Sequence, residues 1–336
     1  MQLKNTNPLL SISCLTFNHV FFIKKCLDGF LMQKTTFPIE VIIHDDCSND
    51  GTREIIEEYS RKYPDIIFPI FQTENQYSRG VRGFMARFNF PRCRGKYIAL
   101  CEGDDYWTDP YKLQKQVDFL EANDDYVICG HDAKVIDEKG IVISESKLPD
   151  SLKRDVSSYE LKMGFLLLTS SLVFRNLPIL KNYPKEGAHV LNGDTFLISI
   201  LGQWGKFKFM HEIKPSVCRV HKGGVWSMKS DHFKSMNILK TFFYMAKYHK
   251  KNDVLISKDI FLMTFKWGNS LFISCLNKKL KFSEIIFILR YTIIAHYKIK
   301  GLNKTIIFSI KKVFRLFLNI KFFFYIEPKT HDFILK

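Results

Sequence analysis

Three carboxylates lie close together directly after an apolar, strand-like segment. Glu102, Asp104 and Asp105 fall within four residues, with Gly103 between the first two, and they follow the apolar run 96–100. Such a group repels itself unless it binds a cation or is fully solvated. Because open α/β sheets bind ligands at the carboxyl ends of their strands, we do not expect full solvation here. Hard oxygen ligands suit Mg²⁺ or Mn²⁺, so the pattern predicts a divalent ion; an acidic loop before a helix cap is the alternative.

A second acidic turn follows another strand-like segment. The β-branched run 40–44 leads into Asp45 and Asp46, and residues 48–52 then offer a helix N-cap. Capping needs one residue, whereas two aspartates precede the cap. An aspartate at a strand end can accept hydrogen bonds from a base or a ribose. A dinucleotide dehydrogenase or a P-loop enzyme is poorly supported, because neither glycine-rich signature is present.

The elements that must position these side chains alternate over the first 130 residues. Strands are predicted at 9–15, 40–44, 66–71, 96–101 and 126–130, and helices at 20–33, 51–62 and 109–123. This alternation predicts a largely parallel sheet with helices on both faces. Beyond residue 131 the pattern changes to a hairpin at 135–143, strands at 166–174 and 213–220, and a short helix at 195–201.

Charge is unevenly distributed along the 336 residues. Residues 231–336 carry 20 Lys and Arg against 6 Asp and Glu, a net charge of +14 out of +16 for the chain. This region is rich in aromatic residues and predicts helices at 231–250, 257–277, 282–299 and 302–324. Helices lying in a membrane interface and a helical bundle packed on the body both fit this composition.

The cysteines and the N-terminus bear on the compartment. The eight cysteines are scattered singly, which is typical of reduced thiols in a cytosolic chain. Residues 1–5 lead straight into the first predicted strand without the features of a signal peptide. We therefore expect a cytoplasmic protein that is peripheral on the inner face of the cytoplasmic membrane.

Four motifs in order resemble those of the inverting, family-two glycosyltransferases with the GT-A fold. They lie at residues 9–18, 45–52, 95–105 and 192–194. Phe17 stands where the family usually has Tyr, and Glu102 replaces the first Asp of its Asp-x-Asp-Asp motif. The resemblance covers roughly residues 8–230. It implies a Rossmann-like α/β fold with a mixed, mostly parallel sheet, divided into a nucleotide-binding half (1–130) and an acceptor-binding half (131–230). The basic helical region 231–336 would follow.

The resemblance also implies roles for individual residues. Phe17 would stack near the nucleotide base with the Thr16 backbone beside it, and Asp45 would bind the base, whereas Asp46 has a structural cap as its alternative. Glu102 and Asp104 would face the ribose and the sugar, and Asp104 and Asp105 would hold the metal. Asp194 would be the catalytic base, unless it caps the next helix. His221, in a glycine-rich lid segment, would bind the diphosphate or the metal, unless it is simply solvated. Arg82, with Arg79, would contact the diphosphate, unless both lie on a solvated loop.

We therefore expect a metal-dependent glycosyltransferase using Mn²⁺ or Mg²⁺. It would move a sugar with inversion from a nucleotide-sugar donor, with UDP as the nucleotide, to a hydroxyl of a lipid-linked or growing surface glycan. An anionic membrane surface is an expected partner and nucleic acid is not, because carboxylates would line the main cleft. The alternative is a basic nucleic-acid- or membrane-binding protein with an idle α/β scaffold. A sugar nucleotidylyltransferase would need a glycine-rich loop, which residues 16–19 do not provide.

Overall fold

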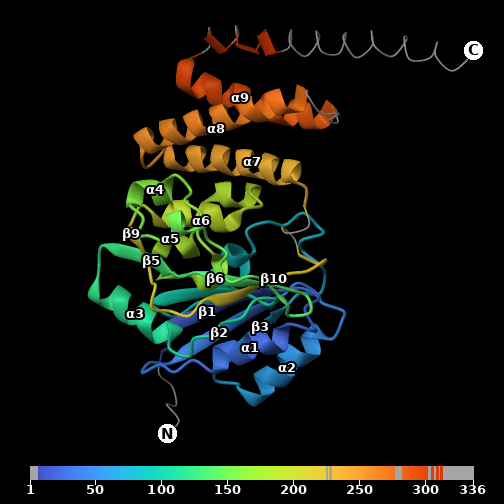
Figure 1. The fold of residues 1–336 in the computed structure, drawn as a ribbon, viewed down its shortest axis with the longest axis vertical. Helices are drawn as coiled ribbons and strands as arrows, with labels where there is room; N and C mark the ends of the chain where they lie inside the picture. The colour runs from blue at the N-terminus through green and yellow to red at the C-terminus, as the bar shows by residue number, and fades with distance from the viewer. Residues whose placement is uncertain are drawn as a thin grey trace, which may run out of the picture. The chain divides into compact units, whose positions relative to one another are not determined.

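The computed structural model describes residues 7–224, 226, 229–276, 282–301, 304–305, 308–309 and 311–312. The chain divides into two compact units, Met1–Ser230 and Asp231–Lys336. Figure 1 labels the elements in chain order. Most of the predicted helix at 302–324 lies outside the described residues.

A seven-stranded sheet forms the centre of the first unit, in the order β3-β2-β1-β4-β8-β5-β9. β8 runs antiparallel to both of its neighbours and the other pairs are parallel, which confirms the predicted mixed, mostly parallel sheet. The strands are β1 (Leu10–Thr16), β2 (Ile39–Asp45), β3 (Ile67–Phe71), β4 (Tyr97–Glu102), β5 (Tyr126–Gly130), β8 (Val173–Arg175) and β9 (Lys206–Phe209).

The predicted strand at 166–174 is wrong over most of its length. Thr169–Ser171 forms a 3₁₀ turn, and β8 begins only at Val173. Side chains take the carbonyls of this segment out of the sheet ladder, since Trp107 Nε1 donates to the Ser170 carbonyl (2.7 Å) and Gln116 Nε2 to the Ser171 carbonyl (2.9 Å).

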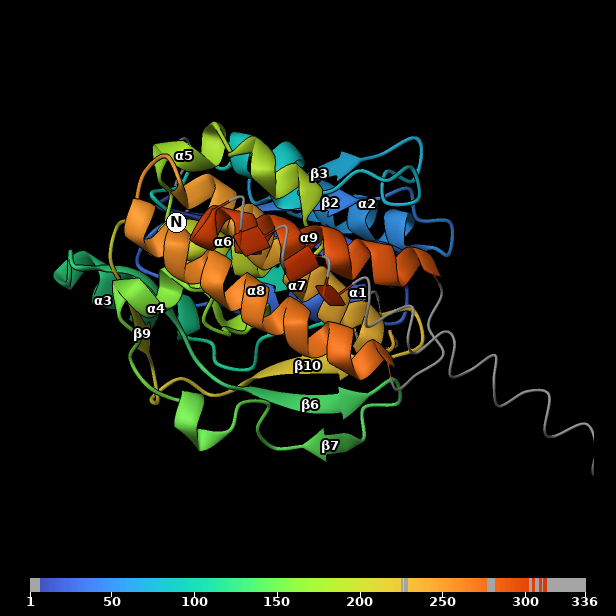
Figure 2. The same cartoon turned by 90° about the horizontal axis from the view of Figure 1, so that it is seen from above.

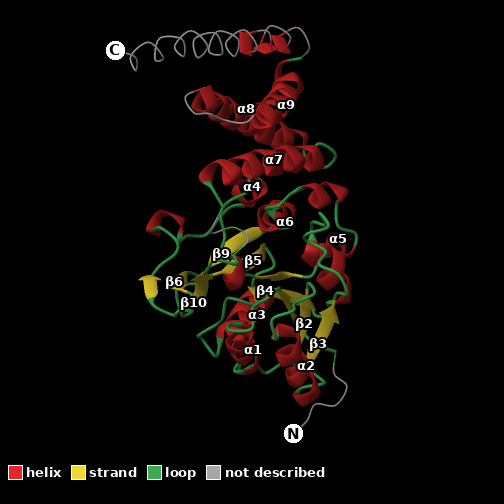
Figure 3. Cartoon of the chain, turned by 90° about the vertical axis from the view of Figure 1, so that its right-hand side faces the viewer, coloured by secondary structure: helices red, strands yellow, loops and turns green. Residues whose placement is uncertain are grey.

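Helices cover both faces of this sheet, as predicted (Figure 3). The apolar residues of β1 alternate, so that Leu10, Ile12 and Cys14 pack on one face with Phe30 and Leu113. That face is covered by α1 (Ile23–Leu31), α2 (Thr52–Lys62) and α3 (Lys112–Ala122); the other carries α4 (Ser158–Lys162), α5 (Pro178–Lys181) and α6 (Gly193–Leu201). Shorter helical turns lie at Met85–Asn89, Phe90–Arg92, Asp150–Leu152 and Lys185–His189.

A smaller sheet, in the order β10-β6-β7, lies beside the main one (Figure 2). Its strands are β10 (Ser216–Val220), β6 (Ala133–Asp137) and β7 (Val142–Ser144). β6 and β7 form the predicted hairpin, which turns at Gly140 with φ of 88°. Tyr106 and Val217 exchange backbone hydrogen bonds of 3.1 and 2.8 Å, so β10 is tied to the turn that follows β4.

The second unit is a set of helices that pack on one another: α7 (Asp231–His249), α8 (Val254–Leu276) and α9 (Phe282–Lys300). The Phe243 ring contacts those of Phe261 and Tyr291, with centroids 5.9 and 4.9 Å apart. A Cβ on Gly268 would lie 2.1 Å from Thr292 Oγ1, so only glycine lets α8 and α9 approach this closely. Within the described part of the chain, no helix has both the length and the apolar character needed to cross a bilayer.

Candidate functional site

The sheet register brings the sequence motifs to one edge. Thr16 at the end of β1 lies opposite Asp45 at the end of β2, and Leu15 lies opposite Glu102 at the end of β4. These three parallel strands therefore present their carboxyl ends together, which is where open α/β sheets bind ligands. Phe17, the next residue after β1, is 42% exposed at this edge, so its ring is available for stacking.

Two loops at this edge are joined by reciprocal hydrogen bonds. Asn18 has a left-handed backbone with φ of 54°, a conformation that Asn tolerates better than most residues. The bonds run from Asn18 N to Ser48 Oγ (2.8 Å), Asn49 N to Asn18 Oδ1 (3.0 Å), His19 N to Thr52 Oγ1 (2.8 Å) and Val20 N to Asp50 Oδ2 (3.0 Å). The backbone of His19 is thereby fixed beside the ends of β1 and β2.

Asp45 and Asp46 have different partners. The Asp45 carboxylate is buried, accepts the Ser48 N–H (3.1 Å) and hydroxyl, and has its pKa raised by burial. The Asp46 carboxylate accepts the N–H groups of Gln76 (2.8 Å) and Tyr77 (3.0 Å). Asp46 is therefore structural, but it anchors the loop after β3 and does not cap α2.

That loop carries the two arginines considered for the diphosphate. Arg82 Nη1 donates to the carbonyls of Val81 (2.6 Å) and Tyr77 (3.2 Å), and its guanidinium lies 4.5 Å from the centroid of the Tyr77 ring. Arg79 pairs with Glu74. Both arginines are engaged within their own loop, and contact of either with a diphosphate stays a prediction.

Asp104 lies between two histidines. His221 Nε2 is 3.0 Å from Asp104 Oδ2, while Asp104 Oδ1 is buried without a hydrogen-bond partner. His19, Asp104 and His221 each offer a ligand atom, and these atoms all lie within 4.8 Å of one another. Over the ranges that the structure describes, this is the one group of three or more such residues close enough to share an ion. Imidazole nitrogens and a carboxylate oxygen are common metal ligands, so the residues fit a divalent ion.

The other two acidic side chains of the motif are placed differently. Asp105 is buried, and its Oδ1 accepts the Arg219 N–H (2.9 Å) of β10. Burial and the neighbouring Asp104 raise the pKa of Asp105 to about 7. The Glu102 side chain is exposed at the surface. Partial desolvation, followed by the charges of Asp104 and Asp105, nevertheless raises its pKa to about 8. The structure thus brings Asp104 together with the histidines and leaves Asp105 bound to the β10 backbone.

Gly103 is required by how closely β1 approaches this turn. A Cβ there would lie 2.6 Å from Thr16 Oγ1 and 3.1 Å from His19 Nδ1. Thr16 Oγ1 itself lies 3.1 Å from His19 Nδ1, and this contact orients the imidazole.

An aromatic side chain supports the histidine that follows β10. The Phe22 and His221 rings meet edge to face at 5.0 Å, and the Arg219 guanidinium lies 4.5 Å from the Phe22 ring centroid. The His19 and His221 rings are 5.6 Å apart, also edge to face. Phe22 therefore packs against Arg219 in β10 and against His221 directly after it.

Asp194 lies in the first turn of α6, where Asn192 is the N-cap residue. Its Oδ1 accepts the Thr195 N–H (2.7 Å) within that turn, so the carboxylate helps to satisfy the free N–H groups of α6 although Asp194 is not the N-cap residue. Burial raises the pKa of Asp194. The charge of Asp194 in turn raises the pKa of Glu102, so the two carboxylates interact electrostatically. A carboxylate with a raised pKa is suited to accept a proton.

Sequence reasoning missed His19 and Lys147. His19 directly follows the predicted first strand and its turn, and a polar ring at a strand end was the available signal. Lys147 has no local signal, since it reaches the site from the segment after β7. The backbone N–H of Lys147 donates to the Ala133 carbonyl (2.7 Å). The positive charge of its side chain lowers the pKa of Asp105 and of Asp194.

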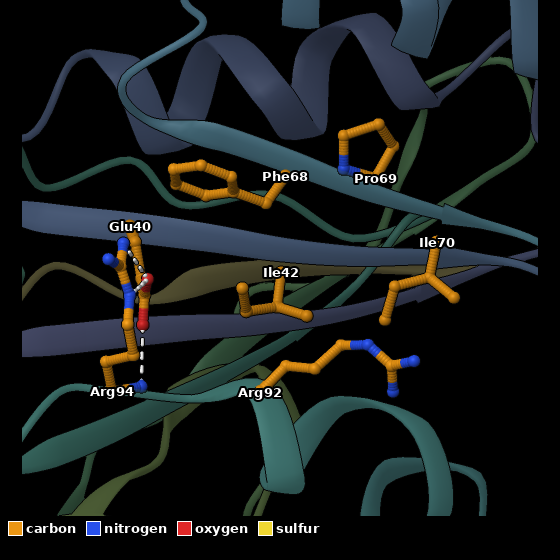
Figure 4. Close-up of a pocket in the computed structure, with 7 residues that line it drawn as sticks. All are labelled: Glu40, Ile42, Phe68, Pro69, Ile70, Arg92 and Arg94. Atoms are coloured by element: carbon orange, nitrogen blue, oxygen red, sulfur yellow. Dashed lines mark hydrogen bonds and ion pairs between the residues drawn. The ribbon is translucent and has the colours of Figure 1, made fainter.

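A separate groove lies beside β2 and β3 (Figure 4). Its lining includes none of the predicted site residues: Glu40, Ile42, Phe68, Pro69, Ile70, Arg92 and Arg94. Arg94 closes one end by pairing with the buried carboxylate of Glu40 (2.7 Å). The acidic edge, and not this groove, is the candidate active site.

Comparisons with known proteins bear on the family and the fold of the chain. The model of the family described as "Glycosyl transferase family 2" matches residues 11–176. The chain is 39% identical over 219 residues to an uncharacterized protein of Mycobacterium tuberculosis, Rv1520, covering 65% of this chain and 60% of that protein. The chain thus spans about 60% of the length of this curated relative.

Solved structures share the fold. The structure of S. aureus TarS 1–349 in complex with UDP-GlcNAc superposes with a TM-score of 0.62 at 15% identity, over 86% of this chain and 81% of that one. The mannosyltransferase PcManGT of Pyrobaculum calidifontis, in complex with GDP-Man and Mn²⁺, gives 0.52 at 12% identity, over 93% and 86%. Residues 11–176 therefore form a domain of glycosyltransferase family 2, and the solved structures show that this domain has the GT-A fold.

Proposed function

We propose that this protein transfers a sugar, with inversion at the anomeric carbon, from a UDP-sugar to an acceptor hydroxyl. One observation carries the proposal: Thr16, Asp45 and Glu102 end three parallel strands at one edge, and Asp104 meets His221 directly after that edge. The nucleotide would lie over β1 and β2 with its base against Phe17 and Asp45. The TarS complex with UDP-GlcNAc supports UDP as the nucleotide.

The chemistry requires one bond to form as another breaks. The acceptor oxygen attacks the anomeric carbon, the bond from that carbon to the β-phosphate oxygen breaks, and its electron pair leaves with the diphosphate. Asp194 accepts the acceptor proton, a contribution typically of about 10²–10⁴-fold. A bound divalent ion would act as a Lewis acid toward the charge developing on the diphosphate. Asp104 and His221, which lie 3.0 Å apart, would hold it, and the Mn²⁺ in the PcManGT complex supports a divalent ion in this fold.

A donor screen tests the proposed activity. Purified protein with Mn²⁺ should release UDP from one UDP-sugar more rapidly than it releases GDP from any GDP-sugar. Asp194→Asn should bind the same donor with unchanged affinity and release at least ~100-fold less nucleotide. Release from no nucleotide-sugar, or equal release by the variant, would contradict the proposal.

We further propose that residues 231–336 hold the enzyme at the anionic inner face of the cytoplasmic membrane, where a lipid-linked or surface-glycan acceptor would lie. The net charge of +14 supports this, as do the exposed apolar side chains of the helices: Val254, Leu255, Leu262, Trp267, Ile273, Ile286 and Tyr297. Each basic residue near such a surface contributes about 1 kcal/mol. Phe314, Phe317, Phe322 and Phe323, predicted from sequence to insert, lie outside the described residues.

Vesicle co-sedimentation of the intact chain tests the membrane proposal. Binding to anionic vesicles should exceed binding to neutral ones and should weaken with salt. The triple variant Lys258→Glu, Lys266→Glu and Lys298→Glu, all exposed, should bind at least ~10-fold more weakly. The control reverses three exposed lysines of the first unit, Lys24, Lys139 and Lys181, and changes the net charge equally. Equal loss in both variants would overturn the assignment to 231–336.

A further inference from the structure

We infer that His19 ligates the divalent ion together with Asp104 and His221, and that this nitrogen-rich set makes the site select Mn²⁺ and related transition ions over Mg²⁺. The inference deepens the proposed function and rests on it for the role of the ion. It places the third protein ligand in the loop after β1, at a position that motif spacing does not mark.

The contacts of Asp104 suit a metal ligand. Its Oδ2 faces His221 Nε2 at 3.0 Å, close to the spacing of two adjacent ligands that lie ~2.1 Å from one octahedral ion. Its Oδ1 is buried without a hydrogen-bond partner, which is costly for a charged oxygen. An ion between Asp104 and the two imidazoles would satisfy this carboxylate.

His19 is held in a fixed position beside that carboxylate. Its backbone N–H donates to Thr52 Oγ1 (2.8 Å), and its Nδ1 lies 3.1 Å from Thr16 Oγ1. A hydroxyl on one ring nitrogen fixes the orientation of the imidazole, as partners of metal-binding histidines commonly do. The His19 and His221 rings then approach edge to face at 5.6 Å, with a ligand atom of each within 4.8 Å of the other.

The types of ligand determine which ion is preferred. Mg²⁺ is bound mainly by oxygen and gives up water reluctantly, whereas first-row transition ions bind nitrogen ligands with an affinity that increases from Mn²⁺ to Co²⁺. Two imidazoles with one carboxylate therefore favour the transition ions. Asp105 lies outside this three-residue group, and its Oδ1 accepts the Arg219 N–H (2.9 Å).

Metal binding to the full-length protein, without any nucleotide-sugar, tests this inference. Mn²⁺ affinity is measured from the loss of the free-ion EPR signal, and electron spin-echo modulation shows how many ¹⁴N ligands the bound ion has. We expect two imidazole nitrogens in the wild type and one in His19→Gln. The variant should raise the Kd for Mn²⁺ by ~10–100-fold and the Kd for Mg²⁺ by less than ~3-fold, which reduces the selectivity.

The matched control is His211→Gln, an exposed histidine of the same unit outside the three-residue group. It should leave the Kd and the nitrogen count unchanged, and the Tm of both variants shows that each is folded. Unchanged Mn²⁺ affinity in His19→Gln, fewer than two nitrogens in the wild type, or no Mn²⁺ binding would overturn the inference. UDP release by the wild type is scored separately, so failure of the glycosyltransferase proposal is distinguishable from failure of the ligand assignment.

Discussion

The imidazole of His221 lies 3.0 Å from the carboxylate of Asp104, although 117 positions separate the two residues in the chain. The contact exists because Val217 of β10 and Tyr106 after β4 exchange two backbone hydrogen bonds. The smaller sheet thus carries its last residues to the acidic edge of the main sheet.

The two aspartates of the motif should respond differently to the same substitution. Asp104→Asn removes the charge that faces His221, and we expect donor turnover to fall by at least ~100-fold. In Asp105→Asn the amide oxygen can still accept the Arg219 N–H, so turnover should fall by less than ~10-fold. Initial rates of UDP release, with Tm as the folding control, measure the difference. Equal losses would mean that both carboxylates hold the ion.

Asp194→Asn should raise stability as it removes activity. Burial raises the pKa of Asp194 in the folded protein above its ordinary value of 3.8. The folded state therefore disfavours the ionised carboxylate, and the free energy of unfolding falls as the pH rises from the ordinary pKa to the raised one. The neutral amide avoids this cost and can still accept the Thr195 N–H. The Tm of the variant should exceed that of the wild type at pH 7, and the two should converge below about pH 4. A lower Tm at pH 7 would show that the carboxylate is structural.

Adding one methyl group at Gly103 should disrupt the site. The Cβ of Gly103→Ala would lie 2.6 Å from Thr16 Oγ1 and 2.8 Å from Thr16 Cβ, so β1 or the turn must move. We expect the Tm to fall by at least ~4 °C, which corresponds to 1–2 kcal/mol in a protein of this size. Gly193→Ala is the matched control, because nothing lies within 4 Å of its Cβ. Equal Tm values for the two variants would contradict this packing.

Lys112 should make stability depend on pH above neutrality. Its side chain is fully buried, donates to Gln116 Oε1 (2.6 Å) and lies 4.3 Å from the Trp107 ring centroid. Burial lowers its pKa from 10.5 to about 7, so the unfolded chain binds more protons between these values and stability rises with pH across that window.

Lys112→Met should therefore raise the Tm at pH 7 by at least ~2 °C and flatten its rise between pH 7 and 10. Thermal melts at intervals of one pH unit measure this. Lys24→Met, an exposed lysine on α1, should change neither the Tm nor its pH dependence. A variant that keeps the wild-type slope would show that Lys112 is not its source.

The sequence by itself determined the main strands and what stands at their ends. Period-two and period-3.6 patterns are local, so β1, β2 and β4 and their flanking helices could be predicted, and parallel strands must then present Asp45 and Glu102 at one edge. Tertiary structure decided which carboxylate meets a histidine. That choice depends on the pairing of β10 with the turn after β4, over more than a hundred residues, and local periodicity contains no information about such pairing. It also brought His19 and Lys147 to the site, because packing and long-range hydrogen bonds select among partners that composition leaves equivalent.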